Sequence, residues 1–406
     1  MQSKNLVNII IPAIIIRLVF SAFFFHPDVK KFHYQVQFLG TGILNVYDYI
    51  EDNKNVLPNT DTFNYFPGNY YVLGLWNIAS RFILGSEFSS WLNDWGLKVY
   101  SHPRMFEFML ILKFPYLILD LTVLYLLLRL SPSPKIHQSI TLFWLFNPIS
   151  LYAIYMLGQI DIIPAVLTVG ALLLIRNKKL WQAAILLGLG AAVKTYPLLL
   201  LPFVLLRTST VKQFITVAII GILAFIIPML PVINSPAFRY TMAHTNLTQF
   251  IFYAGLPVSS GQTLPIYILI WGLVFWASWK RKSSYNVLPE FLTLTLAVTL
   301  FSHFHAQWII WSLPFLVLYL AEHASKWPVV LALVVGFFGT VILIPDQFVF
   351  LGLFSQVNPQ IGIFPSIYDL LKPVADPNFI QSMFHTLLAA SGLYIIISVW
   401  QAYENK

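Results

Sequence analysis

An aspartate follows the first apolar segment of the chain after only a few residues. Residues 6–25 are apolar, and Asp28 lies in the polar stretch behind them, close to His26, Lys30 and Lys31. A carboxylate at a membrane surface can act as a general base that removes a proton from an attacking hydroxyl group. A lone aspartate at such a place is more often a helix cap or a solvated loop residue. The neighbouring basic residues and the length of the loop nevertheless lead us to predict that Asp28 is catalytic.

Breaks between apolar segments hold three more polar residues that could contact a substrate. Gln159 and Asp161 occupy a connection of a few residues, and Lys194 separates two short apolar segments. Asp161 would also cap the helix that follows it, and the two roles can coexist. If Lys194 simply ended a helix, its long side chain would only extend the ammonium group to the membrane surface. At a broken helix, however, a lysine beside free backbone N–H groups would bind phosphate, which is the role that we predict for it.

Histidines and tyrosines complete the set of candidate binding residues. His303, His305 and Gln307 end an apolar segment, and Tyr47 and Tyr65 lie in the long polar stretch after Asp28. Zinc-binding histidines on a helix are usually four residues apart, so that they share a face. A spacing of two residues points the side chains apart, so we predict contacts to phosphate or hydroxyl groups and no metal site. The alternative for the two histidines and for Tyr65 is a place at the membrane interface.

The composition predicts an integral membrane protein. The chain has 406 residues, of which 58% are hydrophobic and 10% are charged, whereas soluble domains carry about 25% charged residues. The formal net charge of +8 then reflects basic cytoplasmic loops, and no nucleic-acid partner is expected. The absence of cysteine excludes disulfides, thiolate metal sites and cysteine nucleophiles.

We predict an all-α polytopic fold in a single domain over residues 1–406, with about twelve transmembrane helices. The segments at 180–193 and 196–206 are short enough to be half-helices that meet inside the protein. Residues 26–105 are predicted to form a long first exterior loop that carries interfacial helices. The apolar segments are 6–25, 106–129, 138–156, 162–176, 180–193, 196–206, 212–233, 263–279, 286–302, 306–320, 327–344 and 381–402.

The orientation follows from lysines and arginines in the short loops, which favour the cytoplasm. With twelve spans and both termini in the cytoplasm, every such cluster is cytoplasmic, and the candidate site residues all fall on the exterior side. The clusters are Arg129 with Lys135, Arg176 with Lys178 and Lys179, Arg207 with Lys212, Lys280 to Lys282, and Lys326.

Two charged residues lie near the middle of predicted spans. Arg17 and Asp120 are at nearly equal depth when residues are counted from the cytoplasmic ends at about 1.5 Å each. Charges at this depth are rare and usually paired. We therefore predict a structural ion pair that joins the first two helices.

An ordered set of short motifs resembles the C-type (GT-C) glycosyltransferases, and within them the bacterial and archaeal relatives of the second mannosyltransferase of GPI-anchor synthesis. The motifs cover about the first half of the chain, and the set is more specific than any one of them. They are His26-Pro27-Asp28, Asn45-Val46-Tyr47-Asp48, Tyr65-Phe66-Pro67-Gly68, Lys113 to Asp120, Phe146-Asn147-Pro148, Gly158-Gln159-Ile160-Asp161 and Lys194-Thr195-Tyr196-Pro197.

This resemblance implies an inverting hexosyltransferase, acting with mannose or a similar sugar, whose site opens to the exterior face of the plasma membrane. The donor would be a polyprenyl-phosphate sugar, and the acceptor a lipid-linked or exported glycan. Asp28 would be the general base, and Lys194 with His303 or His305 would offset charge on the phosphate. Gln159 and Asp161 would hold sugar hydroxyls or orient the base. No cofactor is expected, although a divalent cation stays possible.

Two other classes of protein remain open at this stage. A transporter or flippase of lipid-linked saccharides would also have many spans, but it should show internal repeats and charged residues along a path at the midplane. A polymerase or ligase of exported polysaccharide usually places its large exterior loop late in the chain. The chain has no evident repeat, and its long polar stretch comes first, so the transferase is the favoured prediction.

Overall fold

The computed structural model describes residues 3–95, 99, 102–131, 133–245 and 250–404. In this part of the chain the protein is nearly all α-helical, as the sequence predicts, and the one exception is a two-stranded antiparallel sheet. The helices before residue 100 are α1 (Ser3–Phe23), α2 (Pro27–Val36), α3 (Val46–Asp52), α4 (Pro67–Leu84) and α5 (Ser86–Asn93). Residues 26–105, predicted as a loop with interfacial helices, therefore contain four α-helices.

The middle of the chain contains the helices that the sequence marks as apolar. They are α6 (Met105–Leu130), α7 (His137–Leu145), α8 (Pro148–Ser150), a π-helix (Leu151–Met156), α9 (Ile162–Arg176), α10 (Leu180–Val193), the 3-10 helix η5 (Tyr196–Leu200), α11 (Leu201–Leu205) and α12 (Val211–Ile226). The helix breaks after Val193 as predicted, since Lys194 is extended with φ −145° and ψ 134°. The two halves, α10 and η5 with α11, meet at this residue.

The last third of the chain folds back over the middle. Its elements are α13 (Pro236–His244), β1 (Gly255–Ser259), β2 (Gln262–Pro265), α15 (Ile266–Lys280), α16 (Leu288–Phe301), the 3-10 helix η8 (Ala306–Trp311), α17 (Leu313–Glu322), α18 (Trp327–Ile342), α19 (Ile367–Leu371) and α20 (Pro377–Glu404). Short 3-10 turns connect several of these helices.

Fewer helices have the length and composition of a membrane span than the sequence predicts. Five qualify among the described residues, or six if the bent pair Asn8–Phe23 and Pro27–Thr41 counts as one span. The prediction of twelve spans is therefore not confirmed. The other apolar segments form helices of 10–17 residues, which are short for a bilayer about 30 Å thick.

Burial explains why some of these short helices, α16 above all but not α15, need not match the bilayer. Every residue from Leu288 to Leu300 of α16 is buried, so this helix packs against protein on all sides. In contrast, α12 exposes large apolar residues such as Phe214, Ile219 and Leu223. A helix that is apolar all round is stable inside a protein core as well as in lipid.

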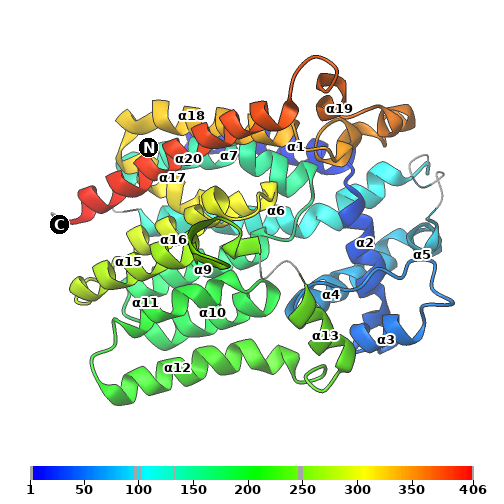
Figure 1. Ribbon diagram of the computed structural model, residues 1–406. Helices are drawn as coiled ribbons and strands as arrows, with labels where there is room; N and C mark the ends of the chain where they lie inside the picture. Colours follow the sequence, from blue (N-terminus) through cyan, green and yellow to red (C-terminus); the bar gives the residue numbers. More distant parts are fainter. Residues whose placement is uncertain (1–2, 96–98, 100–101, 132, 246–249, 405–406) are drawn as a thin grey trace.

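The long helices run roughly side by side, and both ends of the described chain lie on the same side of the molecule (Figure 1). The first helix begins and α20 ends on the left of the view, while α2, α3, α4 and α5 gather on the right with α19. The polar residues after the first helix are thus carried to the end of the bundle that lies away from both termini.

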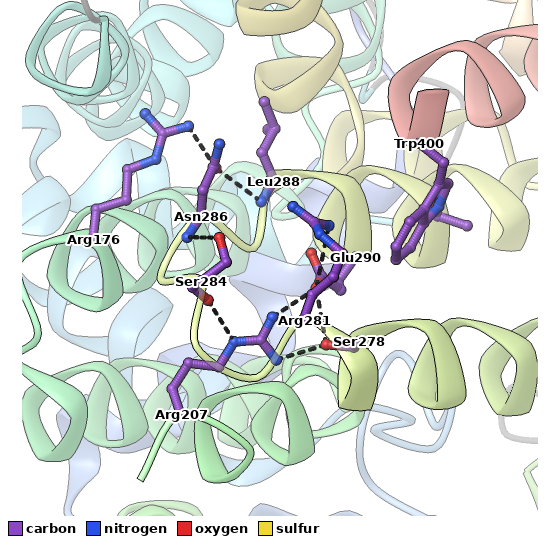
Figure 2. A network of polar contacts seen from close by, with 10 residues as sticks. Arg176, Arg207, Ser278, Arg281, Ser284, Asn286, Leu288, Glu290 and Trp400 are labelled. Atoms are coloured by element: carbon purple, nitrogen blue, oxygen red, sulfur yellow. Dashed lines mark hydrogen bonds and ion pairs between the residues drawn. The ribbon is translucent and has the colours of Figure 1, made fainter. Parts of the chain in front are cut away.

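A buried polar network joins the turn after α11 to α15 and α16 (Figure 2). The guanidinium of Arg207 donates to Glu290 Oε1 at 2.7 Å and to Ser278 Oγ at 2.6 Å, and the side chains of Arg207 and Glu290 are fully buried. Arg281 lies 3.9 Å from the same carboxylate oxygen. Arg207, which the sequence suggests as a loop cation, is therefore a core residue, because its long stem reaches a buried acid.

Arg17 and Asp120 are brought together between α1 and α6. Arg17 Nε lies 2.5 Å from Asp120 Oδ2, and both side chains are fully buried. Arg17 also donates to the carbonyl oxygen of Leu145 at 2.7 Å, and the hydroxyl of Tyr155 donates to Asp120 Oδ2 at 2.8 Å. The contact joins the helices that the sequence suggests, and it also includes residues from the segment that follows α6.

Candidate functional site

Asp28 lies in the first turn of α2 but does not cap it. The cap is His26, whose Nδ1 accepts the backbone N–H of Asp28 at 3.1 Å. The carboxylate of Asp28 accepts a hydrogen bond from the amide of Gln159 at Oδ2, at 3.0 Å, and the same oxygen lies 3.6 Å from His26 Nδ1. The side chain of Asp28 is 37% exposed, whereas Gln159 is buried. Gln159 thus holds one oxygen of a carboxylate that stays open to a ligand.

Asp161 and Lys194 form a tight ion pair beside this site. Lys194 Nζ donates to both carboxylate oxygens of Asp161, at 2.7 and 2.8 Å, and Trp311 Nε1 donates to Oδ1 at 2.6 Å. Asp161 precedes α9, but its side chain makes no capping hydrogen bond. The interpretation as a helix cap is therefore wrong for the side chain, because its oxygens are used by Lys194 and Trp311.

Asp28 and Lys194 line the same pocket, which encloses about 230 Å³. Its wall comes from the first turn of α2, the loop before α4, the break after α10, α13 with the residues after it, and η8 with His305 before it. The lining residues are Asp28, Asn64, Tyr65, Phe66, Val193, Lys194, Thr195, Met242, Thr245, Ile251, His305, Gln307, Trp308 and Trp311. Sites for drug-sized ligands usually enclose about 300–1,000 Å³, so this pocket fits a small polar group such as one sugar ring.

The two histidines face different hollows. His305 lines the pocket with Asp28, while His303 stacks on Phe250 with ring centroids 4.5 Å apart and lines a separate hollow beside α18 and α20. Burial, with a smaller effect from Lys194, lowers the pKa of His305 to about 4. Its imidazole is therefore neutral at pH 7 and can donate or accept a hydrogen bond but carries no charge. The buried Nε2 of His305 has no partner among the described residues.

The two candidate tyrosines have different positions. Tyr65 lines the pocket, and Lys194 Nζ lies 5.7 Å from the centre of its ring. Burial, and then the charges of Asp28 and Asp161, raises the pKa of Tyr65 well above its ordinary value, so its phenol stays protonated. Tyr47 does not line the pocket; its hydroxyl donates to the carbonyl oxygen of Tyr65. Tyr47 therefore supports the loop that presents Tyr65.

Two tryptophans belong to the site although sequence reasoning did not select them. Trp311 stacks on Tyr196 with ring centroids 4.1 Å apart and on Trp308 at 5.2 Å. Both tryptophans lie in a segment apolar enough to be read as part of a span. Their nearness to His305 and Gln307 in the sequence was the available signal, because the same short helix carries all four to the pocket.

The described residues contain no group of three or more His, Asp or Glu side chains that could hold a metal ion. The lining of the pocket includes one carboxylate, Asp28, and one ammonium group, Lys194. This arrangement can remove a proton at one point and stabilise negative charge at another.

A nearly all-helical chain with several apolar helices of spanning length, and a pocket that holds a carboxylate and an ammonium group, has the features of a membrane protein with a candidate active site. The chain belongs to glycosyltransferase family 87, whose family model matches residues 110–344. This is a family of polytopic transferases of the GT-C type, so that part of the resemblance is confirmed. The particular relation to GPI-anchor mannosyltransferases is not confirmed.

The family match covers Gln159, Asp161, Lys194 and His305, while Asp28 precedes the matched residues. No curated protein and no solved structure matches the chain. Membership of the family indicates a glycosyltransferase, which supports the transferase over the flippase and polymerase alternatives.

Proposed function

We propose that the protein transfers a hexose, mannose or a similar sugar, from a polyprenyl-phosphate donor to a lipid-linked or exported acceptor, with inversion at the anomeric carbon. The observation that carries this proposal is the placement of Asp28 and Lys194 in one pocket, each held by a buried partner. Family 87 membership supplies the reaction class, and the charges in the pocket support the assignment of roles.

In the proposed reaction Asp28 removes the proton of the acceptor hydroxyl. The hydroxyl oxygen attacks the anomeric carbon, and the bond from that carbon to the phosphate oxygen breaks, so its electron pair leaves with the phosphate. A single displacement of this kind inverts the anomeric configuration. Lys194 stabilises the negative charge on the departing phosphate, and neutral His305 donates a hydrogen bond to it. Gln159 keeps the carboxylate of Asp28 in place.

The number of cations in the pocket supports a monophosphate as the leaving group. Lys194 is the one lysine or arginine that lines the described pocket, and Asp161 already offsets part of its charge. A sugar diphosphate would bring more negative charge than one such cation can balance. A monophosphate carried on a lipid suits the pocket better, since its polyprenyl tail can remain in the bilayer while the sugar enters between the helices.

The donor class can be tested directly with purified protein. Radiolabelled sugars on polyprenyl phosphate, with mannose, glucose and galactose compared, are incubated with a lipid extract that supplies acceptors. We expect label transfer from one or more of these donors, with inversion of the anomeric centre visible by NMR. Matched nucleotide sugars should give no product. Direct use of a nucleotide sugar, or retention of configuration, would contradict the proposal.

We also propose that the pocket faces the exterior, that both termini lie in the cytoplasm and that the chain passes the membrane about twelve times. Because the chain has no cysteine, single introduced cysteines report each side cleanly. In intact cells, a cysteine at Asn55 should react with an impermeant maleimide, and one at Ser283 should react only after permeabilisation. Both positions are exposed, so burial does not confuse the result, and the reverse pattern would contradict the exterior site.

A further inference from the structure

Lys113 is a fully buried lysine in the middle of the fold that the proposed reaction does not use. It lies on α6, and its side chain has no exposed surface. Its ammonium group donates to the carbonyl oxygen of Phe24 at 2.6 Å and to that of Tyr155 at 2.8 Å. No acidic side chain lies within ion-pair distance of it among the described residues. A buried cation without a counter-ion is costly, so its position calls for a functional reason.

The two carbonyl groups that Lys113 binds belong to the segments that carry the catalytic carboxylate and its partner. Phe24 comes four residues before Asp28, at the end of α1, and Tyr155 comes four residues before Gln159. Phe24 and Tyr155 are separated by more than 100 residues of sequence. One ammonium group therefore connects the backbone segment that precedes Asp28 with the backbone segment that precedes Gln159.

The turn that presents Gln159 is built closely around the stem of Lys113. Gly158 has a φ of +66°, a conformation that favours glycine. A Cβ atom at Gly158 would lie 2.4 Å from Val29 Cγ2 and 3.0 Å from Lys113 Cε. The first turn of α2, the Gly158 turn and the lysine stem are thus in direct contact, with no room for a side chain between them.

Tyr155, whose carbonyl oxygen binds Lys113, is also held through its side chain. The hydroxyl of Tyr155 donates to Asp120, which also binds Arg17. The side chain of Tyr155 is thus held by the ion pair of α1 and α6, while its carbonyl oxygen is held by Lys113. A shift of the Gly158 turn would have to break one of these contacts.

We infer that Lys113 is a positioning residue that sets the hydrogen bond between Gln159 and Asp28 and thereby aims the carboxylate at the acceptor hydroxyl. The inference rests on the proposed role of Asp28. It concerns geometry alone, since Lys113 does not line the pocket and touches no substrate. A displacement of about 1 Å at a reacting group can cost roughly 100-fold in rate.

Kinetics provide the first test. Lys113→Met fills the same space but cannot bind the two carbonyl groups, so kcat should fall about 10- to 100-fold while the KM values stay within about 2-fold. Lys113→Gln, whose amide can still donate to one carbonyl group, should retain an intermediate kcat. Arg207→Met is the matched control, because it also removes a buried cation. Arg207 belongs to the network with Ser278 and Glu290 and contacts neither Phe24 nor Tyr155 there. It should keep the parental kcat per folded molecule.

A cross-linking test reads the geometry without using activity. The double variant Asp28→Cys/Gln159→Cys places two thiols where the side chains now meet, and copper phenanthroline should join them. Adding Lys113→Met should slow this cross-link about 10-fold, whereas adding Arg207→Met should leave its rate unchanged.

The outcomes separate this inference from the proposed function. An unchanged cross-linking rate in the Lys113→Met background would overturn the positioning role, whatever the activity. Slower cross-linking together with a parental kcat in Lys113→Met would support the connection through Lys113 and contradict the assignment of Asp28 as the base. A rise in KM alone, with kcat unchanged, would place Lys113 in substrate binding and also overturn the inference.

Discussion

Asp28→Asn should lower kcat by about 100-fold or more, the usual contribution of a well-placed general base. The substitution keeps the size of the side chain, and its amide oxygen can still accept the hydrogen bond from Gln159 that the carboxylate accepts now. It removes the ability to take a proton from the acceptor hydroxyl. The rate of sugar transfer at saturating donor and acceptor measures the effect, and thermal unfolding in detergent checks that the fold is kept.

A neighbouring acid provides the control for this experiment. Asp61 lies in the same polar stretch, pairs with Lys31 at 2.7 Å and has a side chain that is 55% exposed. It does not line the pocket, so Asp61→Asn should transfer sugar at the parental rate. If Asp28→Asn also transferred at that rate, Asp28 would be only a residue of the first helical turn, and the proposed mechanism would be wrong.

Lys194→Met should have two effects of different origin. Removing a preorganised donor from the departing phosphate should lower kcat/KM for the donor by about 100- to 1,000-fold, with little change in the KM of the acceptor. Removing the partner of fully buried Asp161 should also lower the free energy of unfolding by roughly 3–5 kcal/mol, the usual cost of a stranded buried charge. Activity and denaturation curves measured on the same preparation report both effects.

The double variant Lys194→Met/Asp161→Asn separates these effects. It removes both charges, so most of the stability should return, while donor use should stay low because the phosphate still lacks its cation. Arg207→Met is again a useful comparison, since it removes the nearest cation from buried Glu290 and leaves Arg281 at 3.9 Å; it should lower stability without changing the kcat of the folded enzyme. Recovery of donor use in the double variant would mean that Lys194 serves only to balance Asp161.

The amino-acid sequence by itself determined the class of fold and pointed to several of the residues that line the candidate pocket. Apolar segments and the scarcity of charge predict a helical membrane protein, because lipid requires each backbone polar group to be satisfied within its own segment. Residues such as Asp28 and Lys194 stand out for the same reason: a charge beside an apolar helix is unusual. Their predicted place on one side of the membrane rests on counting segments and loop charges, and the count of twelve spans is not confirmed.

The tertiary structure alone decided which side chains meet. Asp161 is bound by Lys194 and Trp311, from positions 33 and 150 residues further along the chain, and no local pattern encodes such contacts. His303 and His305 line different hollows although their ring centroids lie 5.2 Å apart and Phe250 packs against both. The number of spans could not be predicted from the sequence either. The apolar helix α16 is buried on every side, and a helix surrounded by protein needs neither the length nor the orientation that a bilayer imposes.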